Sequence, residues 1–224
     1  MSIINEGIAA CIKCGNRQNL SVYNSINVVE NPDLKEKVMD GSLFLWECSE
    51  CGTVNLTKYE TLYHDPENKL MVWLIYNDDI SSTQMQAITN HAKAIGDYKL
   101  RTVNDLGGLM EKVLIHNAGL DDRVIELCKY VTKMEIASKL DESQTKDFWA
   151  APFHFYKMND GEAPFITFMY PDTTSLDGER RMIHANVGMN VYEDCLGIIE
   201  RNPNIKNGEG FEKIDSQWLL SIMS

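Results

Sequence analysis

Several features that would assign this 224-residue chain to a broad class of protein are missing from it. The longest apolar run, Leu70 to Tyr76, has the length of a strand and falls far short of the about 18 residues that a transmembrane helix needs. Residues 1–10 lack the basic start and the apolar core of a secretory signal. We therefore expect a cytoplasmic protein without a membrane partner, in a compartment where thiols stay reduced.

An excess of basic residues is also missing. The chain carries 21 Lys and Arg against 33 Asp and Glu, which gives a formal net charge of −12, and both halves of the chain are acidic. A nucleic-acid-binding protein normally presents a basic surface to the phosphate backbone. Nucleic acid is therefore not expected as a partner, and another protein is the partner class that we predict.

The sequence contains none of the common motifs for nucleotide binding or nucleophilic catalysis. It has no Walker loop, no dinucleotide fingerprint and no Gly-x-Ser-x-Gly motif. Internal repeats and low-complexity tracts are absent from it as well. The sequence therefore assigns no catalytic residue and no binding site for an organic cofactor.

The most informative feature of the sequence is a pair of cysteine motifs. Cys11-Ile12-Lys13-Cys14-Gly15 is followed, after a gap of 33 residues between Cys14 and Cys48, by Cys48-Ser49-Glu50-Cys51-Gly52. Two thiolates separated by two residues can bind one metal ion from a tight turn, and the following glycine permits the positive φ that such a turn requires. The gap exceeds the usual spacing of about 15 to 20 residues, so we expect two separate knuckles that folding brings together.

Three interpretations of these four cysteines compete. A structural zinc site with Cys11, Cys14, Cys48 and Cys51 as ligands is favoured, because all four donors are sulfur and no open coordination position is implied. A thioredoxin-type redox pair requires a helix directly after one Cys-x-x-Cys motif, and neither motif precedes a helical pattern. Disulfide bonds are the third interpretation, and the expected cytoplasmic location disfavours them.

The first half of the chain predicts an antiparallel sheet with helices. Alternating apolar residues from Leu20 to Val28 indicate a half-buried strand, and Asn31-Pro32 begins a short helix. Ser81-x-x-Gln84 is a capping box that starts a longer helix, and Asp121 caps another. We expect a zinc-ribbon-like α+β domain with a helical C-terminal part over residues 1–138.

The second half predicts a smaller unit of three strands and a helix. Asn159-Asp160-Gly161-Glu162 is a hairpin turn between two apolar strands, and a third strand is expected from Arg180 to Ala185. Asn190 is the expected N-cap of the helix that follows. The polar stretch before this unit predicts a linker at residues 139–150, so that a β-β-β-α domain occupies residues 151–224.

Weaker candidates for chemistry lie outside the cysteine motifs. His64 could reach a metal ion, although four thiolates already complete a tetrahedron. Asp121-Asp122 could be a catalytic carboxylate pair, but helix capping explains both residues. Cys195 with His184 could form the thiol–imidazole pair of a thiol-dependent hydrolase or transferase, which is our alternative to a non-enzymatic protein. Cys195 lies on the apolar side of its helix, however, and Cys128 also has the pattern of a core residue.

One expectation concerns a surface for the protein partner. Tyr23, Tyr59 and Tyr63 lie at odd positions, opposite the apolar residues of the first predicted strand. An aromatic outer face of this kind is common at protein interfaces. The competing expectation is that helices within residues 81–135 cover the same face as a second layer.

Beyond the cysteines, several longer stretches match a known family. They are Ser25-Ile26-Asn27, Asn31-Pro32-Asp33-Leu34-Lys35-Glu36-Lys37-Val38, Leu62-Tyr63-His64-Asp65, Lys69-Leu70-Met71-Val72-Trp73, Tyr98-Lys99-Leu100-Arg101 and Gly119-Leu120-Asp121-Asp122-Arg123-Val124-Ile125-Glu126-Leu127. Together with the cysteine motifs they cover roughly residues 8–135, and this part resembles the CpXC family, bacterial proteins named for two Cys-Pro-x-Cys motifs. The resemblance in the last part of the chain is looser and rests on Ile214-Asp215-x-x-Trp218.

The resemblance implies a zinc-binding domain and supplies no reaction. The chain departs from the family at Ile12 and Ser49, which stand where the family has proline. Proline stiffens such a turn but contributes no ligand, so we expect a looser knuckle with an intact site. The predicted function is therefore that of a zinc-binding protein of the CpXC type, whose structural Zn(Cys)4 site stabilises a protein-interaction module.

Overall fold

The computed structural model describes residues 2–76, 80–174, 181–202, 205 and 208–223. The chain divides into two compact units, unit 1 with Met1–Val113 and Gly208–Lys213, and unit 2 with Leu114–Asn207 and Ile214–Ser224. Each unit has its own sheet and its own apolar core. None of the described helices combines the length and the apolar composition that a membrane span requires.

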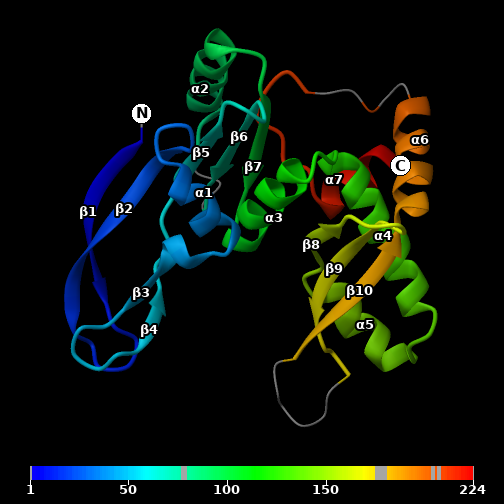
Figure 1. The fold of residues 1–224 in the computed structure, drawn as a ribbon, viewed down its shortest axis with the longest axis horizontal. Helices are drawn as coiled ribbons and strands as arrows, with labels where there is room; N and C mark the ends of the chain where they lie inside the picture. Colours follow the sequence, from blue (N-terminus) through cyan, green and yellow to red (C-terminus); the bar gives the residue numbers. More distant parts are fainter. Residues whose placement is uncertain (1, 77–79, 175–180, 203–204, 206–207, 224) are drawn as a thin grey trace. The chain divides into compact units, whose positions relative to one another are not determined.

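Helices and strands are interspersed along the chain (Figure 1). The described elements that begin in unit 1 are β1 (Ile3–Ala10), β2 (Arg17–Asn27), α1 (Pro32–Met39), the 3-10 helix η1 (Ser42–Phe44), β3 (Leu45–Glu47), β4 (Val54–Leu56), β5 (Thr61–Asp65), β6 (Leu70–Leu74), α2 (Ser82–Ile95), β7 (Lys99–Val103) and α3 (Leu106–Asn117). Those of unit 2 are α4 (Asp122–Ala137), α5 (Glu142–Ala150), β8 (His154–Asn159), β9 (Phe165–Pro171), β10 (Met182–Gly188), α6 (Met189–Arg201) and α7 (Ser216–Met223).

The main sheet of unit 1 has the strand order β1-β2-β5-β6-β7, and β3 and β4 form a separate two-stranded ribbon. The predicted α+β class is therefore confirmed. The sheet is mixed, however, because β2–β5 and β6–β7 are parallel pairs while β1–β2 and β5–β6 are antiparallel. A parallel pair needs a long crossover, which the segment with α1 and the β3–β4 ribbon supplies for the first pair and α2 for the second.

Helices cover both faces of this sheet. On one face, α1 and α3 pack against a core that includes Tyr63, Phe44 and Val72. On the other face, Ala92 of α2 packs against Met71. Buried residues alternate along β5, because successive side chains of a strand point in opposite directions. Four of the five residues of β6 are buried, because helices cover both faces of the sheet there.

The three tyrosines do not form the expected aromatic outer face. Tyr63 is fully buried, and Tyr23 and Tyr59 are partly buried against the same core. The ring of Tyr59 lies 4.9 Å from that of Phe44. Helices cover this face instead: α3 lies within residues 81–135 as the competing expectation states, and α1 lies outside that range.

A segment near the C-terminus returns to unit 1. The backbone of Glu212 bonds to Thr102 and Leu100 beside β7, and its carboxylate lies 3.3 Å from the guanidinium of Arg101. The ring of Phe211 packs edge-on against Trp73 at 5.7 Å. Residues 208–213 therefore belong to the packing of unit 1, although they are far from it in sequence.

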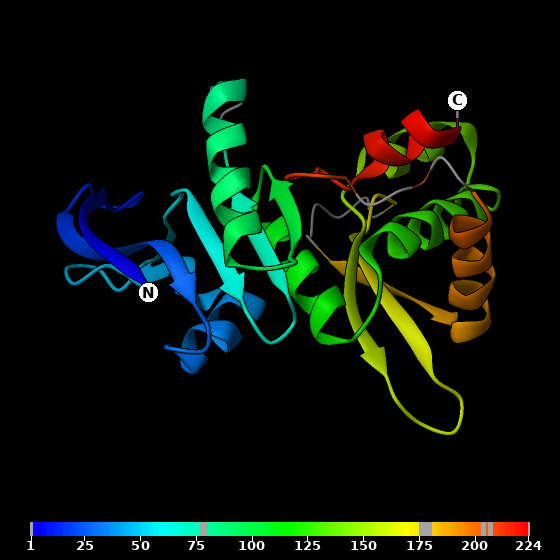
Figure 2. The same cartoon turned by 90° about the horizontal axis from the view of Figure 1, so that it is seen from above.

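Unit 2 contains the predicted three strands and helix. The sheet has the order β10-β9-β8 with antiparallel pairing throughout, and it shares one core with α4, α5, α6 and α7 (Figure 2). Helix α6 begins with Gly188 as its N-cap, two residues before the predicted cap Asn190. Arg180, the expected start of the third strand, lies outside the described residues.

The stretch predicted to be a linker, residues 139–150, contains helix α5. The Asp141 side chain accepts a hydrogen bond from the Gln144 N–H, and the Gln144 side chain accepts one from the Asp141 N–H, which is a complete capping box. Phe148 anchors the helix in the core of unit 2. That residues 1–138 and 151–224 fold as two independent domains remains a prediction.

Candidate metal centre

The two cysteine knuckles fold into the same backbone turn. The N–H of Gly15 donates to the carbonyl of Cys11 at 2.9 Å, and the N–H of Gly52 donates to the carbonyl of Cys48 at the same distance. Gly15 and Gly52 have φ values of +74° and +66°, in the left-handed region that glycine enters at little cost. The glycine that ends each motif therefore closes the turn that aims the two sulfur atoms of the motif at one point.

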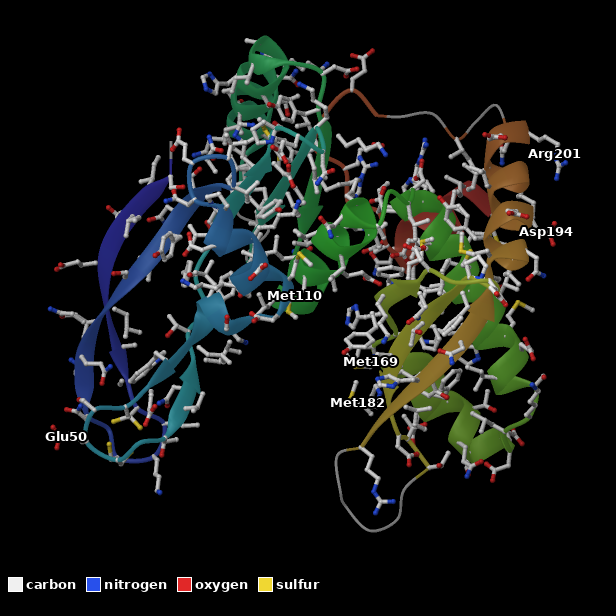
Figure 3. The ribbon with its side chains drawn as sticks, in the orientation of Figure 1. Glu50, Met110, Met169, Met182, Asp194 and Arg201 are labelled. Atoms are coloured by element: carbon white, nitrogen blue, oxygen red, sulfur yellow. The ribbon has the colours of Figure 1, made fainter. Side chains whose placement is uncertain are left out.

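The four sulfur atoms lie within 4.8 Å of one another. The closest contacts join the two knuckles, with 3.6 Å from Cys11 Sγ to Cys51 Sγ and 3.5 Å from Cys14 Sγ to Cys48 Sγ. All four cysteines are free thiols. In Figure 3, sulfur atoms gather beside Glu50 at the end of the strands that carry the knuckles.

This geometry fits a tetrahedral metal ion. A zinc–sulfur bond of about 2.3 Å in a regular tetrahedron places neighbouring sulfur atoms about 3.8 Å apart, close to the contacts across the two knuckles. Folding thus assembles a donor set of four sulfurs in which every tetrahedral position has a protein ligand. The cluster could hold a metal ion.

The two knuckles share a gradient of burial. Cys11 and Cys48, the first cysteine of each motif, are buried, whereas Cys14 is exposed and Cys51 is intermediate. The site therefore has an inner side that is shielded from water and an outer side through which an ion can enter.

Nearby hydrogen-bonding groups lower the pKa of two of the thiols. Backbone N–H groups of Cys14 and Lys13 bring the pKa of Cys11 down to about 6, against the opposing effect of burial. The hydroxyl of Thr53, 3.3 Å from Cys51 Sγ, lowers the pKa of Cys51. These two sulfurs are disposed to be thiolates, the form in which cysteine binds metals.

The pKa of Cys14 moves in the opposite direction. The backbone N–H of Asn16 lowers it, but contacts with the sulfurs of Cys51, Cys48 and Cys11, together with burial, raise the pKa of Cys14 to about 12. Adjacent sulfurs disfavour further negative charge on one another. A divalent cation at the centre of the cluster would remove this repulsion, and its binding would release protons.

Asn55 is a residue of the site that sequence reasoning missed. Its amide Nδ2 donates to the carbonyl of Thr53 at 2.7 Å and points at Cys11 Sγ at 3.7 Å. Between Val54 and Leu56, an asparagine in an alternating strand predicts a solvent-facing side chain. The structure inverts this pattern, because the side chain of Asn55 is only 2% exposed. Its apolar neighbour Val54 is more than half exposed, and Leu56 is about half exposed.

The other candidates from the sequence lie elsewhere. His64 lies in β5, where its ring packs 5.0 Å from that of Tyr98, and it is not a member of the cysteine cluster. Asp121 caps α4 by accepting from the N–H of Arg123, and it pairs with the guanidinium of the same residue. Asp122 is fully buried.

The thiol–imidazole pair is not formed. Cys195 is 2% exposed, and its sulfur interacts with that of Cys128 in the core of unit 2. His184 is exposed on β10, and its ring stacks on Tyr156 at 5.3 Å. Cys195 and Cys128 therefore behave as core residues, as their helical pattern predicted.

Comparison with protein families gives one match. The model of a family described as CpXC protein matches residues 9–129, which is more than half of the chain and includes all four cysteines of the cluster. Comparison with curated proteins and with solved structures finds no match.

Proposed function

This chain belongs to the CpXC family, and we propose that its four-cysteine cluster is a structural zinc site that stabilises a protein-interaction module. The observation that supports the proposal best is the approach of four sulfur atoms from two distant knuckles to within 4.8 Å of one another. Soft thiolate donors favour zinc over magnesium or calcium, which prefer oxygen. With all four positions taken by protein sulfur, a bound zinc ion has no site for an activated water.

A structural role follows from the position of the ligands in the fold. The knuckles stand at the ends of β1–β2 and β3–β4, and those two ribbons belong to different sheets of unit 1. A metal ion that binds both knuckles closes the 33-residue gap between Cys14 and Cys48. Closing a loop of that length costs conformational entropy, which metal binding offsets.

Exposed apolar side chains on the β3–β4 ribbon support the proposal that the partner is another protein. Leu45 and Leu56 face each other across β3 and β4, and Val54 lies on the same face because strand side chains alternate. All three are exposed, as is Ile12 at the tip of the first knuckle. Exposed apolar side chains grouped on one surface are typical of protein-interaction sites. The net charge of −12 disfavours nucleic acid as the partner.

A cytoplasmic location agrees with this proposal. Zinc binding requires reduced cysteines, and the cytoplasm keeps them reduced. The location is tested by the redox state of the four thiols in protein extracted under acid quench from its host. Disulfides among Cys11, Cys14, Cys48 and Cys51 in such an extract would contradict it.

The metal content of the purified protein tests the proposal directly. We expect elemental analysis to find about one zinc ion per chain. The Cys11→Ser and Cys48→Ser variants should lose it, whereas Cys195→Ala, which changes a core cysteine outside the cluster, should retain it. Protein that contains no metal when freshly purified without chelator, with all four thiols titrating as free, would overturn the proposal. Stoichiometric iron in place of zinc would overturn the identity of the metal.

A further inference from the structure

A backbone N–H of each knuckle is hydrogen-bonded to a side-chain amide on the ribbon of the other knuckle, and neither bond involves a cysteine. The backbone N–H of Ile12, in the first knuckle, donates to Asn55 Oδ1 on β4 at 2.9 Å. The backbone N–H of Ser49, in the second knuckle, donates to Gln18 Oε1 on β2 at 3.0 Å. The two bonds are reciprocal, because each knuckle offers the N–H that follows its first cysteine to a side-chain amide on the ribbon of the other.

The remaining atoms of both amides are also used. Asn55 Nδ2 donates to the Thr53 carbonyl at 2.7 Å, which ties the Asn55 side chain to the second knuckle as well as to the first. Gln18 Nε2 donates to the Glu47 carbonyl at 3.2 Å, at the end of β3. A side chain that is held at both ends has few alternative rotamers. The amides therefore act as rigid ties between the two ribbons.

We propose that Asn55 and Gln18 are the positioning residues of the four-cysteine site, which hold the two knuckles in register for metal binding. This inference rests on the proposed function, because it concerns the same site. Without such ties, the ion would have to bring together two turns that are 33 residues apart in sequence. Ties that fix the turns beforehand reduce the conformational freedom lost on binding, and so they increase metal affinity.

The backbone N–H groups of Ile12 and Ser49 can donate these hydrogen bonds because neither residue is proline. Proline has no N–H, so a proline at position 12 or 49 would delete one of the two bonds. Ile12 and Ser49 are the positions at which this chain departs from the Cys-Pro-x-Cys pattern. From the sequence we expected the loss of proline at these positions to loosen the knuckles. The structure assigns the backbone at these positions a stabilising role between the knuckles instead.

The two ties differ in one respect that an experiment can use. Asn55 Nδ2 also points at Cys11 Sγ at 3.7 Å, whereas Gln18 forms no described hydrogen bond with a sulfur. A donor to a ligating sulfur changes the electron density that the sulfur offers to the metal. Loss of Asn55 should therefore alter both affinity and spectrum, and loss of Gln18 should alter affinity alone.

The test measures metal binding by the full chain with Asn55→Ala and Gln18→Ala. Competition with a chromogenic chelator should show zinc dissociation constants raised roughly 10- to 100-fold, the usual effect of losing a partner that orients metal ligands. With cobalt(II) as a probe, the sulfur-to-metal charge-transfer band should shift in Asn55→Ala and stay in place in Gln18→Ala. Asn24→Ala is the matched control, because Asn24 is exposed on the same strand as Gln18 and bonds only to Asn5 among the described contacts.

Ile12→Pro tests the bond from its other end and keeps the test valid if Asn55→Ala does not fold. Ile12 is 84% exposed, so Ile12→Ala removes the side chain, keeps the N–H and should bind zinc like the wild type. Ile12→Pro should weaken zinc binding, and the effect of Asn55→Ala should be smaller in that background because the two changes delete one shared bond.

The outcomes separate this inference from the proposed function. Wild-type protein that binds no metal overturns both. Wild-type protein that binds zinc, with unchanged affinity in Asn55→Ala, Gln18→Ala and Ile12→Pro, overturns the positioning role and leaves the zinc site intact. Fully additive effects of Ile12→Pro and Asn55→Ala overturn the tie between these two residues.

Discussion

At the scale of single residues, the glycines after the second cysteine of each motif have a conformational role. Gly15 and Gly52 adopt φ values of +74° and +66°. A side chain in the left-handed region costs roughly 1 to 2 kcal/mol because Cβ approaches the following carbonyl. The glycine in Cys-x-x-Cys-Gly is thus as much a part of the knuckle as the cysteines.

Gly15→Ala should destabilise unit 1 by about 1 kcal/mol. A Cβ at this position would meet no atom within 4 Å, so backbone strain is the only contribution that we expect. Urea unfolding of the zinc-loaded protein measures the change. Gly161→Ala is the control, since a Cβ there also meets open space but the backbone does not have a positive φ. Equal stability of the two variants would contradict the role of the left-handed turn.

Cys195 should resist alkylation in the native protein. The residue is buried, and its sulfur interacts with that of Cys128 in the core of unit 2. Timed labelling with iodoacetamide and peptide mass spectrometry should find Cys195 unmodified until denaturant is added. Cys51, which is partly exposed and whose pKa is lowered, serves as the positive control after zinc is chelated. Rapid labelling of native Cys195 would reopen the possibility of a thiol-dependent enzyme.

At the scale of secondary-structure elements, a buried carboxylate joins α1 to the β5–β6 hairpin. Asp65 accepts hydrogen bonds from Lys35 Nζ at 3.0 Å, from the Tyr63 hydroxyl at 3.2 Å and from the backbone and side chain of Asn68. Burial raises the pKa of Asp65. The hydrogen bonds from Asn68 and the ion pair with Lys35 lower it by more than burial raises it, so that the pKa lies below its ordinary value. The carboxylate is thus stabilised in its charged form.

Asp65→Asn should lower the stability of unit 1 at neutral pH by about 1 to 3 kcal/mol. Because the pKa is lower in the folded protein than in the unfolded chain, the contribution of Asp65 is complete above its ordinary pKa of about 4. It is lost as the pH falls from there through the folded pKa. Urea unfolding between pH 2 and 7 should therefore show that the stabilities of wild type and variant converge in acid.

Asp33→Asn provides the control for this pH dependence. Asp33 forms an exposed ion pair with Lys37 on α1, and such pairs contribute little. A stability difference between wild type and Asp65→Asn that stays constant from pH 7 to pH 2 would contradict the role of the ionised carboxylate.

At the scale of the whole molecule, zinc should stabilise one part of the chain and not the other. Cys11→Ser and Cys48→Ser should lower the melting temperature of unit 1 by at least about 5 °C, because they remove the metal that closes the loop between the knuckles. Hydrogen exchange should increase mainly in residues up to Tyr76. Unit 2 has its own core and should exchange like the wild type. If both variants lose zinc yet melt and exchange like the wild type, the metal is not structural.

Limited proteolysis distinguishes the predicted linker from the observed helix. Because Phe148 is buried and Asp141 caps α5, we expect residues 142–150 to be protected from protease as long as unit 2 is folded. Early cleavage within residues 139–150 that leaves two resistant fragments would instead support the predicted domains 1–138 and 151–224. Mass spectrometry of the first fragments decides between them.

The amino-acid sequence alone determined the features that depend only on residues close together in the chain, namely the knuckle turns, the helix caps and the strands of unit 2. The Cys-x-x-Cys-Gly motifs predicted the cluster, because a tight turn with two sulfurs is specified by five consecutive residues. Ser81 and Asp121 were identified as helix caps, since a cap bonds to N–H groups within three residues of itself. The strands of unit 2 followed from alternation and a turn signal.

Tertiary structure alone decided how distant segments meet. The parallel pairing of β2 with β5, the burial of Asn55 beneath the knuckles and the return of residues 208–213 to unit 1 are long-range arrangements. A single sequence carries no pattern for them, because strand alternation does not state which strand is the neighbour or which face is covered. The ties from Ile12 to Asn55 and from Ser49 to Gln18 are of this kind, since they exist only after both ribbons have folded together.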